Sequence, residues 1–159
     1  MSSVVMTRTV TVNAAFLQEI KDVNQELWQR LEELRHRCQR PIAPVNCRHL
    51  VERMSQLRDQ LALHFALEEA YGYFDDPVDV APRLSHAAET LRSEHRELYM
   101  QLTHIVDRGE RLLHNEQLAT LALWIGPGYL GFDDALRDHE SRENELIYEA
   151  YDTDLGAGD

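Results

Sequence analysis

Cysteine is scarce in this sequence, and long apolar runs are absent. The two cysteines, Cys38 and Cys47, do not form a Cys-x-x-Cys pair, so the sequence excludes an iron–sulfur cluster and a cysteine-ligated structural zinc site. They flank the first expected connection between helices. Two free thiols in a reducing cytosol are expected there, and a disulfide across the connection is the alternative. No apolar run approaches the length that spans a bilayer.

Basic residues are also few. The sequence holds 16 Lys and Arg against 28 Asp and Glu, which gives a net charge of −12. Nucleic acids and anionic membranes both attract basic patches, so neither is an expected partner. Residues 1–12 lack the apolar core and small-residue cleavage pattern of a signal peptide, and a cytoplasmic location is expected. With 159 residues, 43% of them apolar, the chain is long enough for one globular domain with its own core.

Apolar residues recur at helical spacing over most of the chain, and no segment alternates as a strand does. We expect an N-terminal arm at 1–12, a helical domain at 13–152 and a flexible tail at 153–159. Four long helices are expected, running from Ala14 to about Cys38, from a cap at Asn46 to near Gly72, from about Pro82 to between Gly109 and Asn115, and from about Tyr129 to Tyr151.

A short helical piece, Glu116–Ile125, precedes the last of these helices. We expect Gly126-Pro127-Gly128 to break it from the helix that follows, because proline removes a backbone donor. Long amphipathic helices with short connections predict an all-α fold, an antiparallel up-down-up-down four-helix bundle.

Two histidines are each followed by a glutamate four residues later, His64 by Glu68 and His139 by Glu143. Residues four apart lie on one face of a helix, and in both cases this face also carries the apolar stripe expected to face the core. A buried ionisable group is costly unless it is paired or ligated. The pairs therefore predict metal ligation, and two His–Glu pairs exposed to water at one end of the bundle are the alternative.

A third histidine, His95, lies on the apolar stripe of the third helix, between Leu91 and Leu98. Ligands at matching depth on different helices of a bundle converge in its core. Three imidazoles with two carboxylates favour iron or another first-row metal over Ca²⁺ or Mg²⁺, with zinc or manganese as substitutes. Two carboxylates that can bridge suggest two metal ions. For His95 alone, a satisfied core histidine is the alternative.

This order of ligands, His-x-x-x-Glu on the second helix, His on the third and His-x-x-x-Glu on the fourth, resembles the hemerythrin-like (HHE cation-binding) family over nearly the whole chain. The resemblance implies a non-haem di-iron centre that interacts with dioxygen, nitric oxide or peroxide, or that senses or stores iron. It also implies that His95 and His139 hold one iron and His64 the other, with Glu68 and Glu143 bridging them.

The sequence departs from the family pattern at two positions. Where the family has a histidine on the first helix, this chain has Asn24, whose amide binds first-row metals less well than imidazole. Where the oxygen carriers of the family have a second histidine on the third helix, this chain has Tyr99. Both are additional candidate ligands, with a core-edge amide and a packed tyrosine as the alternatives. Fewer ligands leave more open coordination positions, which favours redox, peroxide, nitric oxide or iron-sensing chemistry over reversible oxygen transport.

Two other functions stay open at this point. One is a di-iron oxidase or peroxidase of the ferritin-like kind, although such sites use Glu-x-x-His, which occurs at neither His–Glu pair here. The other is a degenerate or metal-free bundle that acts through a protein partner, for example as a homodimer formed through exposed Trp28 or Trp124. The acidic pair Asp133-Asp134 is expected to be solvated.

Overall fold

The structure is a computed structural model that describes residues 24–70, 78–79 and 81–158, with side chains as far as Tyr151. Over these ranges it contains helices and turns and no strand, which confirms the all-α prediction. The predicted N-terminal arm at 1–12 and the start of the first helix lie outside the described residues. The helical elements are a first helix over 24–38, η1 (Pro44–Asn46), α2 (Cys47–Ala70), η2 (Pro82–Leu84), α4 (Ser85–His114) and α5 (Leu118–Gly158).

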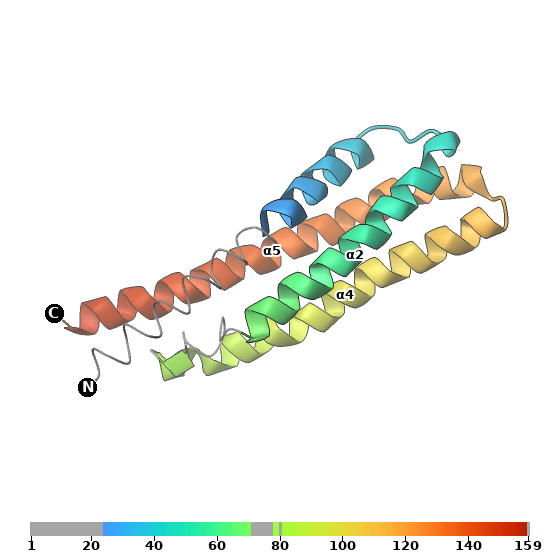
Figure 1. Ribbon diagram of the computed structural model, residues 1–159. Helices are drawn as coiled ribbons and strands as arrows, with labels where there is room; N and C mark the ends of the chain where they lie inside the picture. The colour runs from blue at the N-terminus through green and yellow to red at the C-terminus, as the bar shows by residue number, and fades with distance from the viewer. Residues whose placement is uncertain (1–23, 71–77, 80, 159) are drawn as a thin grey trace.

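The long helices pack side by side as a bundle (Figure 1). The α4 helix contacts both α2 and α5, and α5 also contacts η1. Leucines dominate the main apolar core, which draws on the first helix, α2, α4 and α5. Among the described residues, no helix combines the length and the apolar character needed to cross a bilayer.

Two connections between helices have a clear local cause. One contains a proline at the start of a helix, and the other contains a residue in the left-handed backbone conformation. Pro44 opens η1, where its missing N–H costs nothing because the first turn of a helix has no acceptor for it. The turn between α4 and α5 occupies residues 115–117, and Glu116 adopts a φ of 57° in it. The Gln117 N–H donates to the Leu112 carbonyl at 2.8 Å, which satisfies one of the carbonyls left free at the end of α4.

The predicted break at Gly126-Pro127-Gly128 is wrong. The α5 helix is continuous from Leu118 to Gly158, with Pro127 inside it. It also runs past the predicted end at Tyr151, through most of the range expected to form the tail at 153–159.

Packing on both sides of Pro127 explains the continuity. The buried residues of α5 keep one helical phase through the proline, from Leu121 and Ile125 to Tyr129. Burial of these side chains offsets the hydrogen bond that proline removes. Gly126 serves the same packing, because an added Cβ would lie 3.2 Å from the Cys38 carbonyl oxygen where the first helix ends.

The structure also tests three sequence predictions about individual side chains. Trp28 and Trp124 are half-buried rather than exposed, and the guanidinium groups of Arg137 and Arg108 lie over their rings. Asp133 is fully buried, in contrast to the solvation predicted for it. Cys38 and Cys47 are free thiols, as predicted, and both are buried. Burial and the nearby Asp133 raise the pKa of Cys38 to about 12.

A close contact between α2 and α4 gives a test of this packing. A Cβ added at Gly109 would lie 2.8 Å from Cγ2 of Val51, a stiff side chain that cannot turn aside. We expect Gly109→Ala to lower the free energy of unfolding by about 1 kcal/mol, since overpacking outweighs the gain in helix propensity. Gly131→Ala is the matched control, because nothing lies within 4 Å of its added Cβ. Urea unfolding followed by circular dichroism should show the control slightly stabilised, and equal gains in both variants would contradict this packing.

Candidate metal centre

A layer of ionisable side chains crosses the bundle between two apolar clusters. On α5 the main core ends at Leu136 and a second cluster begins at Leu146. On α4 the same two clusters are separated between Leu91 and Leu98. Within this interval the buried side chains on α4 and α5 are polar, and α2 adds two more of the same kind; the five are His64, Glu68, His95, His139 and Glu143.

The first donor group joins α4 to α5 and consists of His95, His139 and Glu143. Nε2 of His139 and Nε2 of His95 both face Oε1 of Glu143, the latter at 3.4 Å. The His95 and His139 rings meet edge to face at 5.1 Å between centroids. Phe65 stacks on His95 at 3.9 Å and covers it on the α2 side.

Glu94 and Arg142 hold the ring of His139 from behind. Nδ1 of His139 donates to Oε1 of Glu94 at 2.9 Å, and Arg142 donates to both oxygens of Glu94 at 2.7 Å. Arg142 first and His139 second lower the pKa of Glu94, so this carboxylate stays ionised as the acceptor. Burial alone would lower the pKa of His139, but the hydrogen bonds to Glu143 and Glu94 outweigh it and raise the pKa. With Nδ1 donating to Glu94, a metal ion would take the place of the proton on Nε2, which is the usual arrangement behind a metal-bound histidine.

The second donor group joins α2 to α5 and consists of His64, Glu68 and Glu140. Nε2 of His64 lies 3.0 Å from Oε1 of Glu140 and also contacts Oε1 of Glu68. Burial alone would lower the pKa of His64, but the hydrogen bonds to Glu140 and Glu68 together raise it to about 10. A proton on Nε2 therefore lies between the imidazole and the carboxylates.

Electrostatic contact links the two groups through Glu68 and Glu143. Burial and the neighbouring Glu143 raise the pKa of Glu68. Burial acts the same way on Glu143, but His139, His95 and the neighbouring Glu68 outweigh it and lower the pKa of Glu143. Two neighbouring buried carboxyl groups disfavour carrying two full negative charges at once.

The donor set fits a cation. In each group the donor atoms lie within 4.8 Å of one another, and metal–ligand bonds of about 2.1 Å place opposite ligands about 4.2 Å apart. Oε2 of Glu68 and Oε2 of Glu143 are buried and make no hydrogen bond. Carboxylate oxygens buried without a donor are costly, and a cation between the groups would satisfy them.

The structure brings together all five residues expected to form the centre, and it adds two. Glu140 joins the His64 group, and Glu94 orients His139. The sequence pattern missed both because neither takes part in a His-x-x-x-Glu pair. A signal was present for Glu140, since it lies one helical turn before Glu143 on α5, but that turn is rich in acidic residues and gives no reason to single it out.

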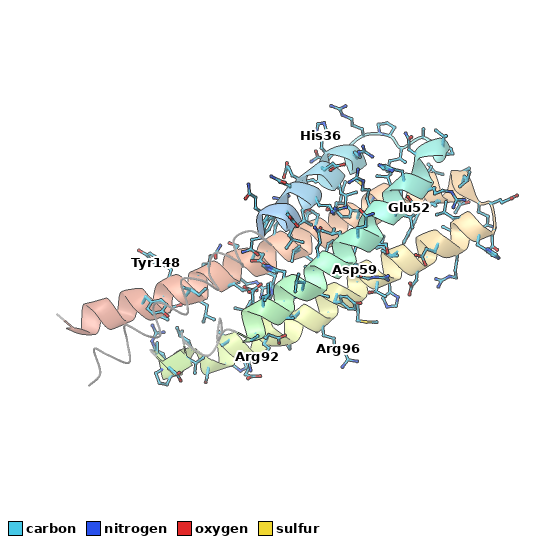
Figure 2. The ribbon with its side chains drawn as sticks, viewed as in Figure 1. His36, Glu52, Asp59, Arg92, Arg96 and Tyr148 are labelled. Carbon is cyan, nitrogen blue, oxygen red and sulfur yellow. The ribbon has the colours of Figure 1, made fainter. Side chains whose placement is uncertain are left out.

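The two additional candidates, Asn24 and Tyr99, are half-buried. Oδ1 of Asn24 is buried and makes no hydrogen bond, so the first helix carries an unsatisfied amide oxygen into the bundle. Tyr99 lines an open hollow of about 330 Å³ together with Phe65 and His95. Arg92 and Arg96 of α4 also line this hollow, and Figure 2 shows both on the outer side of the helix. The hollow therefore leads from solvent towards the first donor group.

Comparison with known proteins adds no relative: no protein-family model, no curated protein and no solved structure matches this chain. The geometry of the chain itself therefore defines the class of site. It is a candidate metal centre with two His/Glu donor groups inside a helical bundle.

Proposed function

We propose that this protein is a hemerythrin-like bundle that binds two non-haem iron ions and interacts with dioxygen, nitric oxide or peroxide, or senses or stores iron. An antiparallel up-down-up-down arrangement is part of the proposal. It is supported by the short connection 115–117 between α4 and α5, which pack against each other, because short connections join antiparallel neighbours.

One observation carries the proposal: two donor groups inside the bundle consist of imidazole and carboxylate ligands, and Glu68 of one interacts with Glu143 of the other. Mixed N/O ligands suit iron and other first-row metals, whereas Ca²⁺ and Mg²⁺ prefer oxygen alone. His95, His139 and Glu143 would hold one ion, and His64 with Glu68 the other. Glu68 and Glu143, whose carboxyl groups interact, would lie between the two ions.

The residues around the donor groups support small-molecule chemistry. Bound iron would supply open coordination positions at which a diatomic molecule or peroxide can bind. Phe65 shields one face of His95 from water, and the hollow beside Tyr99 gives a small ligand a route inward. Glu94 and Arg142 keep the His139 ring fixed while its Nε2 acts as a ligand.

A second candidate, a di-iron oxidase or peroxidase, is favoured by one specific observation. Glu140 adds a third carboxylate to the centre, which brings the donor set closer to the carboxylate-rich sites of ferritin-like oxidases. Optical spectra of the iron-loaded protein distinguish the two. A stable adduct with dioxygen or nitric oxide supports the hemerythrin-like proposal, whereas repeated turnover of peroxide supports the oxidase or peroxidase.

The test of metal binding itself is the iron content of the full chain after anaerobic loading with Fe²⁺ and removal of excess metal. We expect about two iron ions per chain, one for each donor group. A chain that retains no iron, manganese or zinc would contradict the proposal and would support the metal-free bundle that acts through a partner.

Replacing His95 separates the two groups. His95→Ala removes one of two imidazoles from the first group and leaves His64 unchanged, so the iron content is expected to fall from about two to about one per chain. His104→Ala is the matched control, because His104 is exposed on the same helix. Retention of full iron by His95→Ala would remove this histidine from the site.

A further inference from the structure

We infer that Glu140 is the third protein ligand of the second group and makes it an oxygen-rich pocket that favours a hard first-row cation such as Mn²⁺. The inference rests on the proposed function, because it assumes that the centre binds metal. It goes beyond that function in two respects. The two pockets would prefer different metals, and the ligand that completes the second pocket would come from α5 rather than from the first helix.

Helix geometry explains why Glu140 reaches the second group. His139 and Glu143 are four residues apart on α5, on the face that meets His95 and Glu94 of α4. Glu140 follows His139 directly and is turned about 100° around the helix axis from it. This rotation directs Glu140 towards α2, where its Oε1 lies 3.0 Å from Nε2 of His64.

The second pocket is built from two buried side chains and one that is partly buried. The side chains of His64 and Glu68 are 3% and 2% exposed, and that of Glu140 is 13% exposed. Oε2 of Glu68 makes no hydrogen bond. Glu140 pairs with His64, whereas Arg142, two residues further along α5, pairs with Glu94 and Asp138. A carboxylate placed here therefore adds negative charge that a cation would balance.

Ligand chemistry distinguishes the two pockets. The first has two imidazoles and one carboxylate, and the second has one imidazole and two carboxylates. Imidazole suits iron and zinc, whereas carboxylates suit harder ions such as Mn²⁺. Glu140 would thus supply the ligand missing at Asn24, and it would do so with an oxygen ligand of full charge. The second pocket is then a complete site with its own preference.

The experiment compares metal-free full-length protein, Glu140→Gln and Glu145→Gln in titrations with Mn²⁺ followed by electron paramagnetic resonance of the free ion. Glu145 is exposed on the same helix and is the matched control. We expect Glu140→Gln to weaken binding of Mn²⁺ to one site by about tenfold or more, and Glu145→Gln to bind as the unaltered chain does. Iron content measured in parallel should keep the equivalent held by His95 and His139.

A second variant tests the preference directly. Glu140→His replaces the carboxylate by an imidazole, so we expect it to bind Zn²⁺ at both sites while losing the stronger Mn²⁺ binding of the second pocket. Wild-type Mn²⁺ affinity in both Glu140 variants would overturn the inference and leave the proposed function standing. Failure of the unaltered chain to bind any of the three metals would overturn the proposed function and the inference together.

Discussion

Glu143→Gln is expected to release both metal ions, the largest effect on binding of any single substitution in this centre. Glu143 contacts His95 and His139 in the first group, and its carboxyl group interacts with Glu68 of the second. Glutamine keeps the shape of the side chain but offers one neutral oxygen, which neither bridges nor balances charge. The affinity for the more tightly bound ion is expected to fall by about 100-fold, measured as retained iron after dialysis against a competing chelator.

The control for this substitution is again Glu145→Gln, two residues further along the same helix. Circular dichroism of both metal-free variants separates loss of ligation from loss of fold. If Glu143→Gln retained one full equivalent of iron, Glu143 would serve a single ion, and the proposed bridging role would be wrong.

Asp133→Ala is expected to give the largest loss of stability, about 2–4 kcal/mol in the free energy of unfolding. Asp133 is fully buried and accepts hydrogen bonds from Arg35, from Nε of Arg137 at 2.7 Å and from the Tyr129 hydroxyl at 3.4 Å. The bond to Arg35 ties the first helix to α5. The two arginines are about one third exposed, so water can solvate their charges once the carboxylate is removed. The expected loss of unfolding free energy is therefore smaller than for a fully enclosed ion pair.

Asp134→Ala is the matched control for Asp133. Asp134 contacts the same Arg35 at 3.1 Å, but its side chain is 70% exposed. A surface ion pair contributes little, so the change is expected to stay within about 0.5 kcal/mol. Denaturant unfolding of the two variants compares the same Asp→Ala change at a buried and at an exposed position. Equal losses of unfolding free energy in both would show that Asp133 does not stabilise the contact between the first helix and α5.

Periodicity predicted the long helices well, because amphipathic segments need a buried face wherever they pack. The predicted boundaries at Cys38, at Asn46 and before Asn115 also agree with the structure. The same pattern predicted that His64, His95 and His139 lie together, since each is on an apolar stripe. The prediction of a helix break at Pro127 was wrong. Proline disfavours a helix interior locally, but tertiary packing on both sides of Pro127 outweighs this effect.

The missed residues have one cause in common. Asp133 pairs with Arg35, 98 residues earlier in the chain, and Glu140 pairs with His64, 76 residues earlier. Asp133 lies four residues after Tyr129 and Glu140 four residues after Leu136, so both share the helical phase of buried residues, but acidic residues are frequent in this part of α5 and the spacing alone did not single these two out. Only the packing of α5 against other helices distinguishes these buried carboxylates from the solvated ones beside them.

The most direct measurement is a crystal structure of the iron-loaded full chain with diffraction recorded on both sides of the iron absorption edge. Our account expects two anomalous peaks inside the bundle, one among His95, His139 and Glu143 and the other among His64, Glu68 and Glu140. Iron peaks confined to the acidic surface, or no peak at all between these six side chains, would contradict it.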